Sequence, residues 1–379
     1  MKKSYGALLI VLMILMAALL LSAGCTAENK NAQASTAKEI ADDKISITDS
    51  LGREVTVPKD PQRVVCSGSG ALRYLTYLQA QDKTVGVDDI EYREDATDAR
   101  PYRIANTQFK DLPLIGEFRG NDDPEKIIAL NPDVIFKTYV TSTADADKLS
   151  EKTGVPVVAL NYGDIGYHRQ DAYESLRIMG KVMVKEERAE EVIAFFEDTI
   201  NDLNSRTKDV PDSTKKTCYI GGVSYRGPHG MQSTQPEYPP FIFLNADNVA
   251  GDLGTEHADV AKEKIIEWNP SIIFLDLASL RTNPSGLDEL KNDPSYQILD
   301  AVKSGEVYGV IPYNSYTANH GNVLADAYYI GKVLYPDNFK DIEPKAKADE
   351  IFEFLVAKPV FDQMNTDAFK GLGFTKLEL

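Results

Sequence analysis

The sequence has few residues of the kinds that bind metal ions directly. Its 379 residues include three cysteines and four histidines, and no group of them has the spacing of a zinc site. A protein that binds free zinc or manganese needs several converging histidine and carboxylate ligands, so the dispersed histidines argue against that class. Cys66 and Cys218 fall in separate predicted strands, one in each half, and we expect two buried thiols rather than a disulfide.

Basic residues are too few to balance the acidic ones. The chain has 41 Lys and Arg against 58 Asp and Glu, which gives a formal net charge of −17. A surface of that sign repels phosphate backbones, and this excludes nucleic acid as a partner. A partner protein with a cationic surface, or a cationic metal complex, fits this charge better.

The apolar run near the start of the chain is too short for an ordinary membrane span. Lys2 and Lys3 precede fifteen consecutive apolar residues, Ala7 to Leu21, whereas a spanning helix needs about 20. We therefore predict a cleaved export signal over residues 1–24. An uncleaved signal anchor is the alternative.

The residues before Cys25 indicate a lipid anchor. The segment Leu21-Ser22-Ala23-Gly24 resembles a lipoprotein signal-peptidase site, although its leucine lies one place further from the cysteine than is usual. We expect Cys25 to be lipidated and residues 25–43, which lack an apolar pattern, to form the anchor and a flexible tether. This places the protein outside the cytoplasm, attached to the cell membrane, and on the periplasmic side if the cell has two membranes.

A phrase of twelve residues occurs twice in the chain. EKIIALNPDVIF spans Glu125–Phe136 and EKIIEWNPSIIF spans Glu263–Phe274, with eight of the twelve positions identical. A short helix, an Asn-Pro stop and an apolar strand are typical of one αβ unit of a parallel sheet. Two copies predict two α/β lobes of similar build, with a cleft between them that could bind a ligand.

The pattern of elements predicts an α/β fold with two lobes, each with a mainly parallel sheet flanked by helices. A β-hairpin over Ile45–Pro58 opens the ordered part. An amphipathic stretch with apolar residues at helical spacing predicts one long rigid α-helix that bridges the lobes. A stiff bridge allows only a small rocking motion of the lobes.

The expected segments are an N-terminal lobe at 44–184, a connector helix at 185–208, and a C-terminal lobe with terminal helices at 209–379. The predicted strands after the hairpin are 63–66, 84–87, 134–137, 155–160, 217–221, 272–276 and 307–311, with a helix over 346–361.

Four segments together resemble one protein family. They are ITDSLGREVTVPKDPQRVV, the two E-K-I-I-x-x-N-P phrases and SYQILDAVKSGEVYGV. They resemble the substrate-binding proteins of ABC importers for iron-siderophore complexes, haem and cobalamin, over roughly Ile45 to Val356. The resemblance implies a monomer of two α/β lobes that holds its ligand between them. It also implies a membrane partner with two permease and two ATPase subunits, and no intrinsic cofactor.

The resemblance gives the first letter of each repeat a role. In such proteins one acidic residue on each lobe docks onto arginines of the permease, and the matching residues are Glu125 and Glu263. Asp123-Pro124-Glu125 reads as the N-cap and first two positions of a helix, where a glutamate stays exposed and ionised. The alternative is that both glutamates only favour their own helix starts.

Polar and aromatic side chains in the loops after the predicted strands are the candidate ligand-binding residues, because ligands bind beyond the carboxyl ends of such strands. Tyrosine and arginine suit an anionic, aromatic chelate. His229 and His320 could complete an open metal site, and the alternative is that these are ordinary loop residues. The candidates are Tyr92, Arg119 and Tyr139 in the first lobe, and Tyr225, Arg226, His229, Tyr313, Tyr316 and His320 in the second.

The expected function is capture of an iron(III)-siderophore-type chelate for an ABC importer. Cobalamin or another corrinoid, haem and a small nickel or cobalt complex remain open. An exported α/β enzyme is the alternative from another class, but the sequence has no Gly-x-Ser-x-Gly elbow and no defensible Cys-His pair. Two weaker patterns are a Gly-rich anion loop at Ser67–Gly70 and an acidic stretch at Asp88–Asp98, which we interpret as a solvated surface loop.

Overall fold

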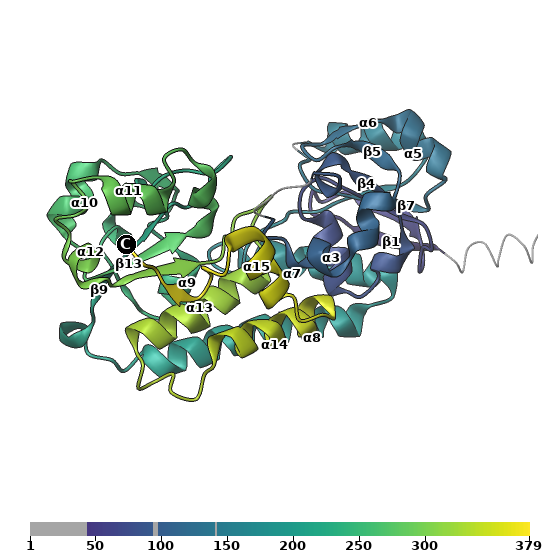
Figure 1. Ribbon diagram of the computed structural model, residues 1–379. Helices are drawn as coiled ribbons and strands as arrows, with labels where there is room; N and C mark the ends of the chain where they lie inside the picture. Colours follow the sequence, from purple (N-terminus) through teal and green to yellow (C-terminus); the bar gives the residue numbers. More distant parts are fainter. Residues whose placement is uncertain (1–43, 94–97, 141) are drawn as a thin grey trace, which may run out of the picture.

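The computed structural model describes residues 44–93, 98–140 and 142–379. Figure 1 shows two lobes joined by long helices that run along one side of the molecule. The predicted export signal, the lipid anchor at Cys25 and the tether lie outside the described residues. Within those residues, no helix combines the length and apolar character that crossing a membrane requires.

The N-terminal lobe contains a six-stranded sheet in the order β6-β5-β4-β3-β7-β8. Neighbouring strands are parallel except β6, which is antiparallel to β5. All residues of β3 and β7 are buried, as expected for central strands of a parallel sheet. The strands are β3 (Val64–Ser67), β4 (Thr84–Asp88), β5 (Leu114–Glu117), β6 (Asn121–Asp122), β7 (Val134–Lys137) and β8 (Val157–Ala159), and the helices are α3 (Ala71–Tyr77), α4 (Pro101–Ala105), α5 (Pro124–Leu130), α6 (Thr143–Thr153) and α7 (Arg169–Met183). The predicted hairpin is β1 (Lys44–Thr48) paired antiparallel with β2 (Glu54–Pro58).

The C-terminal lobe contains a five-stranded sheet in the order β11-β9-β13-β14-β15. Only β15 is antiparallel to its neighbour. The strands are β9 (Thr217–Gly221), β11 (Asp247–Asn248), β13 (Ile272–Asp276), β14 (Val307–Val310) and β15 (Thr375–Lys376), a separate pair is β10 (Ser233–Thr234) with β12 (Ala258–Asp259), and the helices are α9 (Pro239–Phe243), α10 (Lys262–Trp268), α11 (Gly286–Asn292), α12 (Asp300–Ser304), α13 (His320–Leu334), α14 (Pro344–Val356) and α15 (Phe361–Phe369). The predicted fold class, two α/β lobes with mainly parallel sheets, is confirmed.

The two copies of the repeated phrase adopt the same local structure. Asn131 (φ 47°, ψ 56°) is the C-cap of helix α5 and Asn269 (φ 43°, ψ 62°) is the C-cap of α10, both in the left-handed conformation that asparagine tolerates at a helix end. The proline that follows each asparagine cannot continue the helix. The apolar half of each phrase then forms a buried central strand, β7 or β13.

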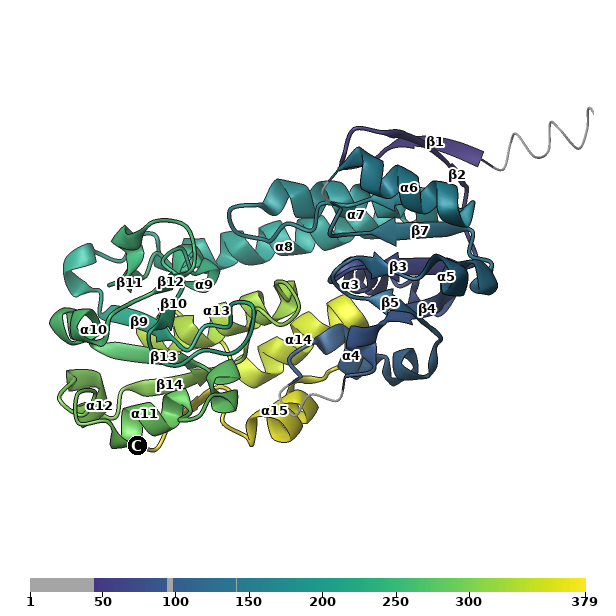
Figure 2. The ribbon, with the colours of Figure 1, turned by 90° about the horizontal axis from the view of Figure 1, so that it is seen from above.

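Helix α8 (Glu186–Thr207) is the predicted connector. Its apolar residues at 3- and 4-residue spacing are buried, as the amphipathic pattern requires. The connector is not alone, because α14 packs on α3 and α4 of the N-terminal lobe and α15 packs on α4. Figure 2 shows α14 beside α13 and reaching towards α4. The segment expected to belong to the C-terminal lobe therefore contacts both lobes.

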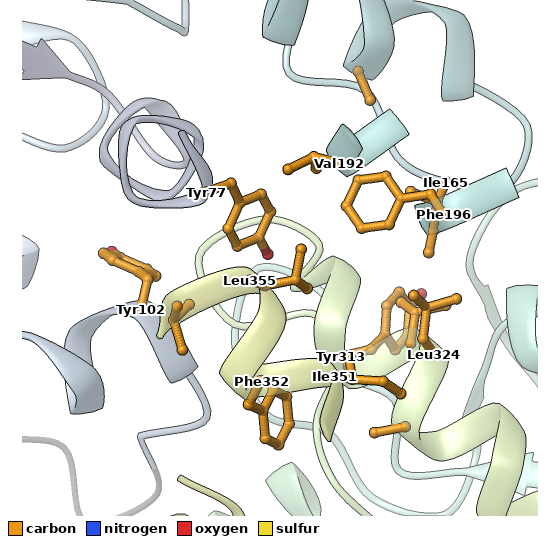
Figure 3. Close-up of a cluster of buried hydrophobic side chains, with 14 of the residues drawn as sticks. Tyr77, Tyr102, Ile165, Val192, Phe196, Tyr313, Leu324, Ile351, Phe352 and Leu355 are labelled. Atoms are coloured by element: carbon orange, nitrogen blue, oxygen red, sulfur yellow. The ribbon is translucent and has the colours of Figure 1, made fainter. Parts of the chain in front are cut away.

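One hydrophobic core runs through the junction of the lobes. Figure 3 shows Tyr77 of α3, Phe196 of α8 and Leu355 of α14 in one buried cluster. The aromatic rings of Phe195 and Phe354 stack 4.1 Å apart between α8 and α14. Because a close-packed core resists shear, a shared core supports a cleft that is largely formed before the ligand arrives.

The C-terminal helix differs from the prediction. A single helix was expected over 346–361, but α14 stops at Val356 and α15 begins at Phe361. Pro359 explains the break, because proline disfavours helical geometry at the residue before it and lacks the backbone N–H of a helix interior.

Candidate functional site

A cavity of about 680 Å³ lies between the two lobes. Loops that follow β4, β5 and β7 supply one wall, and loops that follow β9, β13 and β14 supply the other. These are the carboxyl ends of the strands, where ligands of α/β proteins bind. The lining residues are Arg93, Phe118, Arg119 and Tyr139 of the N-terminal lobe, and Ser224, Tyr225, Arg226, Gly227, Pro228, Ala278, Arg281, Pro312, Asn314, Ser315, Tyr316 and Thr317 of the C-terminal lobe.

The charge of this cavity is opposite to that of the whole chain. Two arginines line it from each lobe, and none of the described lining residues is an aspartate or glutamate. A cleft with charges of one sign concentrates ligands of the other sign. The expectation of a cationic complex was drawn from the net charge of the chain, and that net charge does not describe the lining of this cavity.

Each wall carries an aromatic residue followed directly by arginine. The guanidinium carbon of Arg119 lies 5.2 Å from the centre of the Phe118 ring, and that of Arg226 lies 5.2 Å from the centre of the Tyr225 ring. An arginine placed over a ring is oriented by cation–π attraction while its N–H groups remain available. Both walls therefore present a flat face beside a positive charge.

Tyr316 joins the two walls. Its ring meets that of Phe118 edge-on, with centres 5.1 Å apart and planes at 85°. The Arg93 guanidinium lies 4.9 Å from the Phe118 ring centre and is paired with Asp89 at 2.6 Å. An aromatic side chain of the C-terminal lobe thus packs directly on the N-terminal lobe beside the cavity.

Four lining residues that are not glycine have left-handed backbone angles. These are Tyr139 (φ 57°), Arg226 (φ 55°), Tyr316 (φ 51°) and Thr317 (φ 68°). Such angles are unfavourable for residues with a β-carbon, most of all for a β-branched one, and they persist where the surroundings hold them. Their concentration in one cavity is typical of a binding site.

A buried ion pair supports the wall that carries Phe118 and Arg119. Lys137 Nζ lies 2.5 Å from Asp122 Oδ2 and donates to Gly120 O at 3.3 Å, within the loop that bears Arg119. In the Gly-rich loop nearby, two amide groups already have partners within the lobe. Gly68 N donates to Asp88 at 2.7 Å and Ser69 N donates to Phe118 O at 3.2 Å.

Two histidines contact Tyr225 on the opposite wall. The ring of His257 stacks on Tyr225 at 4.3 Å, and His229 Nε2 lies 2.7 Å from the backbone oxygen of Tyr225. His229 was a predicted ligand or metal residue, but it is not among the residues that line the cavity. Its contact is instead with the backbone of Tyr225, which does line the cavity.

His320 lies in the interior and is not a candidate ligand. Its ring is fully buried and stacked against Tyr74 and Tyr162, with centres 5.7 and 5.3 Å away. Burial, with the nearby charge of Arg73, lowers the pKa of His320 to about 3, so the ring is neutral. The glycine-flanked sequence suggested a loop, but the residue is the first of α13 and faces the core.

The structure brings together five of the nine predicted ligand-binding residues. Of the others, Tyr92 does not line the cavity and donates its hydroxyl to Leu112 O, and Tyr313 lines a second cavity. Phe118 and Arg281 were missed. Arg281 follows β13, and the rule that places ligands after strand ends would have found it had that loop been considered. The five are Arg119, Tyr139, Tyr225, Arg226 and Tyr316.

A second cavity, of about 570 Å³, lies on the other side of the segment 313–318. Its lining includes the acidic residues Asp164, Asp171, Glu237 and Glu256, and no described lysine or arginine. Across residues 44–93, 98–140 and 142–379, no group of three or more histidine, cysteine or acidic side chains is placed to hold a metal ion.

The acidic stretch at 88–98 is not a solvated loop at its described ends. Asp88, Glu91 and Asp98 are each less than a tenth exposed. Glu91 accepts from Tyr102 at 2.6 Å, and Asp98 is paired with the buried Arg100 at 2.8 Å. Glu91 and Asp98 both compensate the buried charge of Arg100, which the sequence pattern did not connect to them.

Glu125 and Glu263 occupy the same position on their helices. Each is the second residue of its helix, α5 or α10, and each is exposed. Neither carboxylate has a hydrogen-bond or ion-pair partner among the described residues. Figure 1 shows the two helices on different lobes, away from α8. The N-cap differs, because Asp123 caps α5 by accepting from Lys126 N at 3.2 Å, whereas Ala261 cannot cap α10.

Comparison with known proteins adds three likenesses. The chain is 22% identical to the uncharacterized ABC transporter substrate-binding lipoprotein YvrC of Bacillus subtilis, over 87% of this chain and 97% of that one. It is 25% identical to the Fe(3+)-citrate-binding protein YfmC of the same organism, over 81% and 90%. The crystal structure of a periplasmic solute binding protein from Veillonella parvula superimposes with a TM-score of 0.68 at 19% identity, over 86% and 97%.

The family model described as periplasmic binding protein matches residues 64–312. That range contains both repeats and the connector, and it covers most of the residues around the first cavity. The chain therefore belongs to the periplasmic binding protein family, as a substrate-binding protein of an ABC importer.

Proposed function

We propose that the first cavity captures an anionic ferric chelate outside the cytoplasm and that the protein delivers it to an ABC permease. The chelate would present carboxylate or catecholate groups, as iron(III)-siderophore-type ligands do. The proposal rests on one observation: four arginines converge on a cavity whose described lining has no acidic residue, in a chain of net charge −17.

The chemistry of the lining suits such a ligand. A guanidinium donates two parallel hydrogen bonds to a carboxylate and remains charged at any physiological pH. Phe118, Tyr139, Tyr225 and Tyr316 add apolar faces for the organic part of a chelate. One of the similar proteins is named for Fe(3+)-citrate, an anionic complex of this kind.

The size of the cavity favours a chelate over a single oxyanion. About 680 Å³ is within the usual range of roughly 300–1,000 Å³ for sites that enclose a small organic ligand. Haem has two carboxylates and fits the charge, but neither His229 nor His320 lines the cavity, so a tyrosine of the lining would have to supply the axial ligand that haem iron needs. A corrinoid without anionic groups fits less well.

Delivery to the permease would use Glu125 and Glu263, with the protein held at the membrane through lipidated Cys25 after cleavage of the export signal. Two exposed carboxylates, one on each lobe, could bind arginines of the two permease subunits at the same time. A monomer with both lobes bound in this way would present its cleft to the importer, whose two ATPase subunits drive transport.

Isothermal titration calorimetry of the full-length protein in mild detergent tests the ligand class. Ferric citrate and a ferric tris-catecholate should bind with micromolar or tighter affinity, which weakens as salt rises because the contacts are ionic. A cationic ferric trihydroxamate, cobinamide, haem and molybdate are the comparison ligands. Tighter binding of the cationic chelate than of ferric citrate would refute the proposal, and consumption of any ligand would favour an enzyme.

A further inference from the structure

The segment Tyr313–Asn319 separates the two cavities. Asn314 and Thr317 line both of them. A bridge between Asn314 and Ala318 closes the segment into a tight loop. From inside the loop, Asn319 Nδ2 donates to Tyr313 O at 3.2 Å and to Ser315 O at 3.1 Å. The loop is therefore a wall whose shape affects the ligand site directly.

The backbone of this wall is in an unfavourable conformation. Tyr316 and Thr317 are consecutive residues in the left-handed region, at φ 51° and 68°. Two such residues in a row, one of them β-branched, do not adopt this conformation unless contacts from outside the segment hold it.

Arg73 supplies those contacts from the other lobe. It lies on α3 and is 1% exposed. Its guanidinium donates to Ala318 O at 2.9 Å and Thr317 Oγ1 at 3.0 Å, and to Tyr316 O and Ser315 O at 3.3 and 3.4 Å. One side chain of the N-terminal lobe thus bonds four successive residues of the wall.

The charge of Arg73 has no carboxylate partner among the described residues. Its other neighbours are the rings of Tyr102 and Tyr162, at 5.1 and 5.4 Å, and the hydroxyl of Tyr162, which also donates to Ala318 O at 2.7 Å. A buried cation is costly unless it is hydrogen-bonded. The carbonyls of the wall compensate it, so the wall and the arginine depend on each other.

We infer that Arg73 is a positioning residue for the ligand site, which it does not itself line. It holds the Tyr316–Thr317 wall in shape across the junction of the lobes, so the C-terminal wall is correct only when both lobes are docked. This inference rests on the proposed function of the first cavity as the ligand site. Lysine cannot replace the fork of Arg73, because a single ammonium cannot reach four acceptors in that geometry.

The test compares Arg73→Met and Arg73→Lys with a control, Arg188→Met. Arg188 on α8 also links distant elements, because it donates to Tyr77 O of α3 at 3.0 Å and to Phe354 O of α14, but it does not contact residues 313–319. We expect Arg73→Met to weaken ferric citrate binding about tenfold to a hundredfold and Arg73→Lys to weaken it less. Arg188→Met should lower Tm but leave the affinity unchanged.

Hydrogen exchange of residues 313–319 gives a readout that needs no ligand. In Arg73→Met these amides should exchange faster than in the wild type, while those of β3 and β7 keep their rates. If the wild type binds no chelate, the proposed function fails but the exchange comparison still tests Arg73. Unchanged exchange in 313–319, or wild-type affinity in Arg73→Met, would overturn the inference. If Arg73→Met does not fold, Arg73→Lys gives both readouts.

Discussion

Phe118 and Arg119 in the N-terminal lobe have a counterpart in Tyr225 and Arg226 of the C-terminal lobe. In both pairs the arginine lies 5.2 Å from the ring before it and faces the same cavity. The supports behind the pairs are unrelated. A buried Lys137–Asp122 ion pair holds the first loop, and the rings and backbone around Tyr225 are held by histidines.

The two lobes share the structure of the repeated phrase but differ in the loops that line the cavity. The repeated phrase gives both lobes the same helix, helix end and central strand. The ligand walls come from loops outside the phrase, so their likeness lies in chemistry and not in sequence. The two lobes share the helix, the central strand and the exposed glutamate of the repeat. Each lobe builds its arginine-bearing aromatic wall from a different loop with different supporting residues.

The largest effect should come from reversing the shared glutamates. The double variant Glu125→Arg, Glu263→Arg should abolish uptake of ferric citrate by cells, because both ion pairs with the permease become repulsions. Calorimetry should show unchanged binding of ferric citrate, since neither residue lines the cavity.

A matched control reverses two exposed glutamates of the helices along the opposite side, Glu187 on α8 and Glu353 on α14. Uptake should then stay near the wild-type rate. Normal uptake in the Glu125, Glu263 double variant would show that the shared positions only favour their helix starts.

The next largest effect concerns the two walls. Arg119→Ala and Arg226→Ala should each weaken ferric citrate binding about tenfold to a hundredfold, because each removes a charged hydrogen-bond donor. If the ligand spans both walls, the double variant should lose about the product of the two factors.

Arg177→Ala is the control, since Arg177 forms an exposed pair with Glu190 away from the cavity. Affinity loss in only one of the Arg119 and Arg226 variants would show that a single wall binds the ligand. The two aromatic–arginine pairs would then not be functional counterparts.

A smaller effect concerns a buried aspartate at the end of a strand in each lobe. Asp88 accepts from Gly68 N at 2.7 Å and Asp276 accepts from Ala278 N at 2.8 Å, and the second oxygen of each has no partner among the described residues. Burial raises the pKa of Asp88 to about 8 and that of Asp276 to about 7.

Because these folded pKa values exceed the unfolded value near 3.8, the folded state binds more protons than the unfolded state. Stability should therefore fall as pH rises from about 4 towards 8. Asp276→Asn imitates the neutral acid and should raise Tm at pH 8 but not at pH 4. Thermal unfolding across this range measures it, with Asp88→Asn as the counterpart. Equal shifts of Tm at both pH values would contradict the assignment.

The smallest effect concerns the N-caps of the repeat helices, which are Asp123 in α5 and Ala261 in α10. Asp123→Ala removes the cap of α5 and should lower Tm by about 1–2 °C, whereas Ala261→Ser adds a cap to α10 and should raise Tm by a similar amount. Calorimetric unfolding of both variants checks this. A loss of stability in Ala261→Ser would mean that the chain before α10 cannot accommodate a cap.

Periodic and local features were predictable from the sequence. The alternation of helices and strands, the duplicated phrase and the buried face of α8 follow from apolar spacing, which burial enforces. The candidates Arg119, Tyr139, Tyr225, Arg226 and Tyr316 followed from one rule about strand ends. The prediction for His320 was wrong because a loop-like sequence does not determine the direction of a side chain. That direction decides whether the side chain contacts a ligand or the core, and His320 is buried in the core.

The sequence by itself determined the two-lobed α/β frame, the stiff bridge and the matched glutamates, because each depends on residues close together in the chain. Only the tertiary structure decided the positive charge of the first cavity, the wall that separates the two cavities, and the contact of Arg73 with residues more than 240 positions later. Such features join distant segments, and their energies depend on distance and burial. Net charge averages over the whole surface, so a chain of charge −17 can still contain a cavity lined by four arginines.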